Sequence, residues 1–132
     1  MVVLKFRAFY EGKMYGVKAV IWTSRGLYVT LDEGNKAGRR VRGAKLMQST
    51  GLFSTFSEDE LFEDDVIFWT YFDEFEDTGK ARIVYRDGCW KLLGIKTGKE
   101  VWDSLFDCLE NCTVFLSGNI YENPELVEVN ND

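Results

Sequence analysis

The chain has 132 residues, of which 45% are hydrophobic and 15% aromatic, enough for a folded core and too much for a disordered chain. Sixteen basic and 22 acidic residues leave a formal net charge of -6, so we do not expect nucleic acid as a partner. The three cysteines favour reduced thiols, and the sequence contains neither a signal peptide nor an apolar run that could span a bilayer. A cytoplasmic protein is expected.

The first half of the chain has the pattern of β-strands. Residues Leu4–Phe9 alternate apolar and polar positions, which predicts a half-buried strand. Two longer runs within Met14–Gly34 are joined by Ser24, Arg25 and Gly26 and predict a hairpin. A further strand is predicted over 40–48.

The second half begins with an acidic connection over 57–65, followed by a strand predicted over Val66–Phe72. Asp87-Gly88 lies between two apolar runs within Arg82–Leu93 and is the strongest hairpin signal in the chain. Apolar residues at three- and four-residue spacing predict an amphipathic helix over Lys99–Asn111, and strand character returns over Thr113–Ile120.

These elements predict a mostly β protein, barrel-like or built as a packed β-sheet domain, with one short helix near the C-terminus. The length favours a single domain over residues 1–132, with one candidate division near 57–65.

The chain contains no histidine, which removes Ser-His and Cys-His nucleophiles and most zinc sites. Ten of the 22 acidic residues fall within twenty positions, but without the spacing of a calcium loop, so a solvated acidic segment is favoured over a cation site. A carboxylate-metal enzyme built on Asp64, Asp65, Asp73 and Glu74 is kept as an alternative. No catalytic residue, metal or cofactor is assigned.

The cysteines and tryptophans are interpreted as core residues. Cys108 and Cys112 lie four apart and would share a face if the predicted helix extended to Cys112, and with Cys89 they offer one soft ligand too few for zinc. The four tryptophans, Trp22 among them, lie in apolar runs typical of the core.

Two groups of residues are the candidates for binding a ligand or partner. Arg39, Arg40 and Arg42 lie in the most basic segment, and in an extended strand Arg40 and Arg42 point to one face and Arg39 to the other. They suit a nucleotide, a nucleic-acid phosphate or an acidic loop of a neighbouring subunit; a solvated edge strand is the alternative. Phe53 and Phe56 lie in a polar, loop-like segment, where aromatics suggest an interface.

Three strings in chain order form the pattern of a known family. KFRAF (Lys5–Phe9) with Met14 lies near the start, LMQSTGL (Leu46–Leu52) at the centre, and GNIYENPEL (Gly118–Leu126) near the end. In these strings the chain resembles the YopX family of small proteins encoded by bacteriophages and prophages. A fourth string, EDDVI, matches the family's EGDIV with Asp64 in the position of the glycine.

The resemblance implies a mostly β, barrel-like fold without an established activity, and no functional residue is carried over from it. The closing string has a physical interpretation of its own. Gly118 supplies an unusual φ, Asn119 and Asn123 can bond nearby backbone, and Pro124 ends strand pairing. We interpret it as a latch that fixes the C-terminal segment to the sheet.

The leading hypothesis is a non-enzymatic phage or prophage accessory protein that acts by binding a host or phage protein, assembled as a homo-oligomer through its segregated acidic and basic segments. One alternative is a protein that sequesters a small nucleotide or immune signal near Arg39, Arg40 and Arg42. The carboxylate-metal enzyme is the other.

Overall fold

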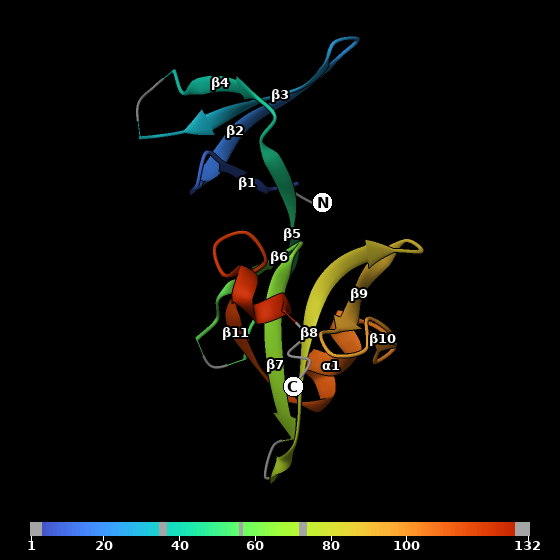
Figure 1. Cartoon of the computed structure of the whole chain (residues 1–132). Coiled ribbons are helices and arrows are strands. Elements are labelled where there is room, and N and C mark those ends of the chain that lie inside the picture. Colours follow the sequence, from blue (N-terminus) through green and yellow to red (C-terminus); the bar gives the residue numbers. More distant parts are fainter. Residues whose placement is uncertain (1–3, 35–36, 56, 72–73, 129–132) are drawn as a thin grey trace. The chain divides into compact units, whose positions relative to one another are not determined.

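The computed structural model describes residues 4–34, 37–55, 57–71 and 74–128, with the backbone alone at 71 and 74–78. The chain forms two compact units, Met1–Ser49 and Thr50–Asp132, here called the N-terminal and C-terminal units (Figure 1). The candidate division near 57–65 falls inside the C-terminal unit. That the chain folds as a single domain stays a prediction.

The mostly β fold with one short helix near the C-terminus is confirmed. The strands form two antiparallel sheets, and in the described part of the chain neither closes into a barrel. No helix of the described residues is long and apolar enough to cross a membrane. The elements are β1 Phe6–Tyr10, β2 Lys13–Thr23, β3 Gly26–Asp32, β4 Arg39–Arg42, β5 Lys45–Phe53, β6 Glu60–Phe62, β7 Asp65–Tyr71, β8 Glu74–Arg86, β9 Cys89–Gly94, β10 Glu100–Val101, α1 Leu105–Asn111, β11 Thr113–Asn119 and the 3-10 helix η1 Pro124–Val127.

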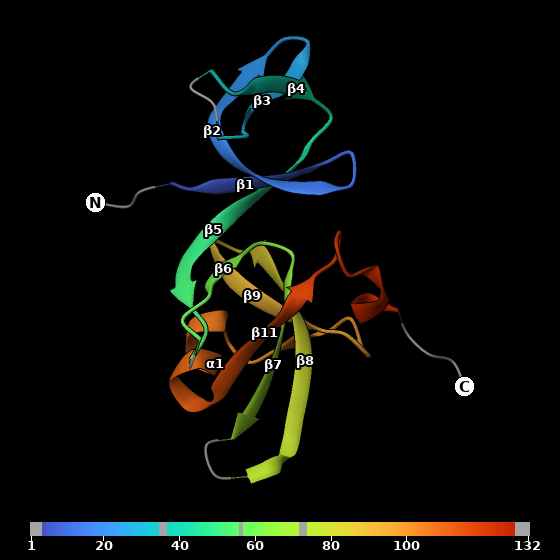
Figure 2. The ribbon, with the colours of Figure 1, turned by 90° about the vertical axis from the view of Figure 1, so that its left-hand side faces the viewer.

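The first sheet is curled and has the strand order β4-β3-β2-β1-β5-β6 (Figure 2). Strands β1 to β4 and the first part of β5 belong to the N-terminal unit. The predicted hairpin is confirmed as β2 and β3, in which Thr23 pairs with Gly26 across a two-residue turn. The first strand begins at Phe6 rather than Leu4, whose side chain is exposed. The strand predicted over 40–48 is two strands, because Gly43 adopts a φ of 86° between β4 and β5.

One face of this sheet carries a small core. Ala8, Val29, Leu31 and Val41 are its buried members, and half-buried tyrosines and leucines pack around them. Val29 pairs with Val41 across β3 and β4, so the core extends to the edge strand.

The sheet of the C-terminal unit has the order β10-β9-β8-β7-β11. The predicted Asp87-Gly88 hairpin is confirmed: both residues have positive φ, 52° and 80°, as a type I′ turn requires. The predicted strands at 66–72 and 113–120 are β7 and β11, which pair with each other.

The core of this unit is larger and gathers residues from strands, loop and helix. Its buried members are Leu61, Ile67, Trp69, Ala81, Ile83, Leu92, Leu105, Cys108, Cys112 and Val114. The indole of Trp69 lies directly over Gly79, where a Cβ would overlap the ring. Glycine at this position of β8 therefore lets the tryptophan pack flat on the sheet.

The helix predicted over Lys99–Asn111 is wrong in its first half. Glu100 and Val101 pair with β9 as the short strand β10, and Trp102 breaks the chain direction with a φ of 60°. The helix starts only after Ser104, whose hydroxyl accepts a hydrogen bond from the Asp107 backbone N–H. A serine cap followed three residues later by an acidic residue is a helix start, and this local signal overrides the apolar spacing.

Candidate functional site

Arg39 is held by its own unit. Its guanidinium forms an ion pair with Glu33 at 2.8 Å and donates a hydrogen bond to the Tyr15 hydroxyl at 3.3 Å. It also lies 5.6 Å from the ring centroid of Tyr10 and 5.8 Å from that of Tyr15. The positive charge of Arg39 is therefore engaged by residues of its own unit.

Arg40 and Arg42 point the other way, as an extended strand requires. Arg40 lies opposite Thr30 and Arg42 opposite Tyr28 on β3, on the face away from buried Val41. Both side chains are exposed, and within the described residues neither takes part in an ion pair or hydrogen bond. Of the three arginines predicted to bind a partner, Arg40 and Arg42 are therefore exposed cations whose side chains are unpaired among the described residues. Arg39 instead contacts residues of its own unit.

A further exposed cation, Arg25, lies in the turn between β2 and β3. The turn is well ordered: the Thr23 hydroxyl donates to the Gly26 carbonyl at 3.0 Å and accepts from the Arg25 backbone N–H at 3.1 Å. A Cβ at Gly26 would lie 3.4 Å from Nε of Arg42, so this guanidinium extends along the start of β3 toward the turn. Arg42 thus reaches the end of the hairpin at which the turn residue Arg25 also lies.

Trp22 lies at the same hairpin end and was misjudged from the sequence. We expected a core tryptophan, but 71% of its surface is exposed, the largest fraction among the exposed large hydrophobic residues of the described chain. Its apolar run had suggested burial, whereas the adjacent turn residues Ser24 and Arg25 were the signal that the strand leaves the core here.

Charge is divided between the units. The N-terminal unit contains ten basic and three acidic residues, a net charge of +7, and the C-terminal unit six basic and 19 acidic, a net charge of -13. The net charge of -6 for the whole chain conceals these two opposite net charges. We name the exposed basic surface of the N-terminal unit, formed by Arg25, Arg40 and Arg42, the basic face.

Phe53 lies in the C-terminal unit at a shallow groove of about 560 Å³, and Phe56 lies outside the described residues. Half of the Phe53 surface is exposed, and Leu109 of α1 and Glu58 lie across the groove. The loop after Phe53 is tied to β11, because the Thr55 hydroxyl accepts from the Val114 N–H at 2.8 Å. Phe53 is thus an exposed aromatic residue at the edge of the groove, next to a loop that is hydrogen-bonded to β11.

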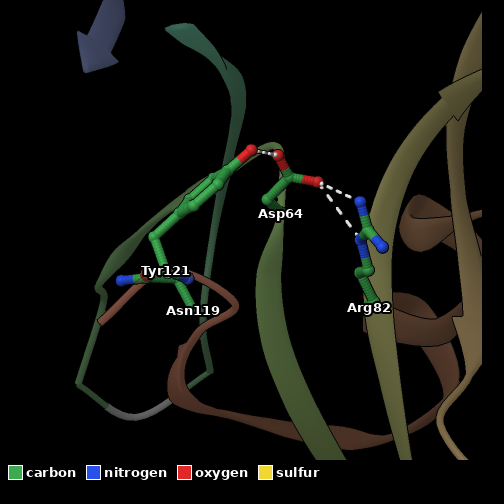
Figure 3. A network of polar contacts seen from close by, with 4 residues as sticks. All are labelled: Asp64, Arg82, Asn119 and Tyr121. Atoms are coloured by element: carbon green, nitrogen blue, oxygen red, sulfur yellow. Dashed lines mark hydrogen bonds and ion pairs between the residues drawn. The ribbon is translucent and has the colours of Figure 1, made fainter. Parts of the chain in front are cut away.

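A network of polar contacts in this unit surrounds Asp64 (Figure 3). One carboxylate oxygen accepts two hydrogen bonds from Arg82, at 3.0 and 3.2 Å, and the other accepts from the Tyr121 hydroxyl at 3.3 Å. Burial, followed by the neighbouring Asp64 carboxylate, raises the pKa of Tyr121. Asp64 has a φ of 70°, a conformation that glycine adopts without strain, which explains how aspartate here replaces the family's glycine.

The closing string forms the turn that carries Tyr121. The side-chain oxygen of Asn119 accepts from the backbone N–H groups of Tyr121 and Glu122, and the Asn123 side chain accepts from the Asn119 N–H. Gly118 has a φ of 151°, and a Cβ there would overlap the Asn123 side chain. The bonding we expected of both asparagines is confirmed.

The acidic residues proposed for a metal site have other contacts. Asp64 binds Arg82 and Tyr121, and the Asp65 carboxylate accepts from the Phe62 backbone N–H at 2.8 Å. Asp73 and the side chain of Glu74 lie outside the described part of the chain. Among the described residues, no three acidic, cysteine or histidine side chains are grouped to hold a metal ion.

The buried position of two cysteines is confirmed. Cys108 and Cys112 are inaccessible members of the core, whereas Cys89 is half-buried, and all three are free. Burial, followed by the neighbouring Cys112 thiol, raises the pKa of Cys108 to about 12, so this thiol is protonated and unreactive near neutral pH.

Comparison with known proteins finds a matching family and solved structures of similar fold. A family model described as YopX protein matches residues 5–128. Protein EF1440 from Enterococcus faecalis is 25% identical with a TM-score of 0.71, over 97% of this chain and 100% of that one. Protein yopX from Bacillus subtilis is 19% identical with a TM-score of 0.62, over 94% and 98%. A comparison with curated proteins finds no match.

Proposed function

The chain belongs to the YopX family, and we propose that it acts by binding an anionic partner rather than by catalysis. The partner contacts the basic face of the N-terminal unit. The observation that carries this proposal is the pair of exposed arginines, Arg40 and Arg42, whose side chains have no ion pair or hydrogen bond within the described residues and lie in a unit of net charge +7.

A guanidinium without an internal partner is available to a carboxylate or phosphate outside the chain. Arg39 offers the contrast within the same strand, because its ion pair with Glu33 and its two tyrosine contacts account for its position. The proposal therefore assigns the external contact to Arg40 and Arg42 and leaves Arg39 with a structural role.

Heparin chromatography with a salt gradient tests this proposal, because heparin is a polyanion without sequence. We expect Arg40→Ala/Arg42→Ala to elute at clearly lower salt than the parent protein. The matched control is Lys13→Ala/Lys45→Ala, which removes the same charge from exposed lysines elsewhere in the unit. Equal shifts of both variants, or no retention of the parent protein, would sink the proposal.

We further propose that the protein forms a homo-oligomer. Two features support it: the opposite net charges of the two units, +7 and -13, and exposed Phe53 beside its groove. Complementary charges of this kind direct partner choice. Sedimentation velocity at low and high salt is the test. Oligomers that dissociate at high salt would indicate pairing of opposite charges between subunits. Oligomers that persist at high salt would indicate contact through Phe53 and its groove. A monomer at low salt would contradict the proposal.

A phage accessory role in the bacterial cytoplasm belongs to the same proposal and follows from the family pattern alone. The two alternatives gain less from the geometry. Neither the groove of about 560 Å³ beside Phe53 nor the groove of about 1100 Å³ beside Trp69 is lined by the arginines that a sequestered nucleotide would need. The carboxylate-metal enzyme would have to displace Arg82 from Asp64.

A further inference from the structure

We infer that the anionic partner of the basic face is an extended acidic segment of another protein, which adds as a further strand to the open edge of β4. The segment has carboxylates at alternate positions, and these pair with Arg40 and Arg42. The inference rests on the proposed function and names the partner class and the binding mode of the same site.

The edge of β4 is open. This strand pairs with β3, and the described part of the chain places no strand beyond it (Figure 1). An edge strand presents backbone N–H and C=O groups to which another extended chain can bind. A peptide strand supplies both donors and acceptors at the matching spacing, whereas a phosphate supplies acceptors alone. The open edge therefore favours a polypeptide among anionic partners.

The register of β2 and β3 shows which backbone groups of β3 point toward β4. Thr23 and Gly26 flank a two-residue turn and form a hydrogen-bonded pair, and bonded pairs alternate with non-bonded pairs from there along an antiparallel ladder. Tyr28, two residues after Gly26, is therefore bonded to β2. The N–H and C=O groups of Val29 point the other way, toward β4.

The same alternation continues into β4. Val29 lies directly opposite Val41, so these two residues exchange the hydrogen bonds that join β4 to the sheet. The N–H and C=O groups of Arg40 and Arg42 therefore point to the open edge. The side chains of both arginines lie on the face away from buried Val41. A strand added at this edge thus meets outward backbone groups and cations at the same two residues.

This geometry defines the sequence pattern of the added segment. Residues directly opposite one another on neighbouring strands have side chains on the same face, about 5 Å apart. A carboxylate opposite Arg40 or Arg42 forms an opposite-charge pair, and neither guanidinium has an ion pair or hydrogen bond in the described structure. The residue between the two carboxylates lies opposite buried Val41, where an apolar side chain extends the core by one strand. The pattern is thus acidic, apolar, acidic.

A second copy of this chain fits the edge less well. Two β4 strands placed edge to edge would bring arginines beside one another, which destabilises such a pair. The one stretch of the sequence with an apolar residue between two acidic residues is Glu74-Phe75-Glu76. Glu74 is already paired with Tyr71 of β7 within its own sheet. The fitting segment therefore belongs to another protein.

Fluorescence anisotropy with a labelled synthetic peptide of about seven residues, in which glutamate and valine alternate, tests the inference directly. The matched control has the same residues arranged in successive pairs, so that no two glutamates lie two positions apart. Both peptides have the same charge, so a contact through charge alone would bind them equally. We expect the alternating peptide to bind about tenfold tighter, because it alone places carboxylates opposite both arginines.

Arg40→Pro and Arg40→Ala separate the backbone contact from the charge. Both variants lose the same cation, and proline also lacks the N–H that points to the open edge. Proline is tolerated at such a position, because this N–H makes no bond to β3. We expect Arg40→Ala to weaken binding of the alternating peptide about fivefold and Arg40→Pro about fivefold more, with equal elution of both variants from heparin. Arg42→Pro repeats the test at the second outward position, and circular dichroism verifies folding.

Three results would overturn the inference. Equal affinity for the two peptides, or no binding of either, would leave the basic face as an anion site without an added strand. Equal weakening by Arg40→Pro and Arg40→Ala would remove the backbone contact. An oligomer of the parent protein that Arg40→Pro dissociates and Arg40→Ala does not would assign the edge to a second copy. Failure of the parent protein to bind heparin would instead contradict the proposed function, on which the inference depends.

Discussion

The two units of this chain use charge in opposite ways. The N-terminal unit is small, has four buried residues in the core cluster of its described part, and carries a net charge of +7 with arginines that face outward. The corresponding cluster of the C-terminal unit has ten buried residues in the described part, and the unit has a net charge of -13. A single value for the whole chain averages surfaces that attract opposite partners. Charge is informative about binding when it is counted over a folded unit.

Individual arginines also differ in whether their charge is paired within the protein. Arg82 in the C-terminal unit and Arg39 in the N-terminal unit are each held by a carboxylate of their own unit. Arg40 and Arg42 have no such partner within the described residues. An arginine that is satisfied internally holds the fold together, and one that is not is free to bind something else.

Core truncation is the largest expected effect and compares the two cores directly. We expect Leu92→Ala to lower the free energy of unfolding by about 4 kcal/mol and Leu31→Ala by about 2 kcal/mol. Both side chains are fully buried, but Leu92 lies in the larger cluster of buried residues. We therefore expect its neighbours to relax less into the cavity that truncation to alanine leaves. Urea denaturation followed by circular dichroism measures both. Equal losses would mean that core size does not separate the units.

Asp64 tests whether its carboxylate compensates for a strained backbone. We expect Asp64→Ala to cost about 2 kcal/mol, because it loses the bonds to Arg82 and Tyr121 and keeps a φ that alanine disfavours. Asp64→Gly loses the same bonds but relaxes the backbone, so it should cost about 1 kcal/mol. Thermal denaturation measures the stability of both variants. A glycine variant that is less stable than the alanine variant would contradict the argument.

High pH probes the buried thiol of the larger core. Burial raises the pKa of Cys108 from 9.0 to about 12. Between these values the unfolded chain has lost the thiol proton and the native chain keeps it, so the free energy of unfolding falls by about 1 kcal/mol per pH unit. Cys108→Ala should show a shallower decline above pH 9, after its packing loss at pH 7 is subtracted. Parallel declines would show that Cys108 is not the cause.

The strands were the predictable part of this fold, because their signals are local. The turns at Ser24-Arg25 and at Asp87-Gly88 lie between apolar runs, and both hairpins formed as expected. The helix failed in its first half because apolar spacing over Lys99–Asn111 also fits a strand, a bend and a shorter helix. The cap at Ser104 was the better guide.

The candidate site was predictable only in part. Alternation along a strand separated Arg39 from Arg40 and Arg42, and the structure places them so. What the sequence did not reveal was which arginine has a partner, because Glu33 and the two tyrosines are brought to Arg39 by pairing between strands. The exposure of Trp22 depends in the same way on where the sheet ends.

The smallest effect separates the two kinds of arginine within one strand. Arg39→Ala removes an ion pair to Glu33 and two ring contacts, so we expect a loss of about 1 kcal/mol in the free energy of unfolding. Arg40→Ala removes an exposed side chain without an ion pair or hydrogen bond in the described structure, and its loss should stay within about 0.5 kcal/mol.

On heparin the order of the two variants should reverse. Arg40→Ala removes a cation that is available to the polyanion and should elute earlier than Arg39→Ala, whose charge is already engaged by Glu33. Both variants have the same net charge, so neither stability nor overall charge can produce this reversal. If Arg39→Ala were the earlier to elute, the contact surface would lie on the other face of β4, and the division between structural and binding arginines would have to be exchanged.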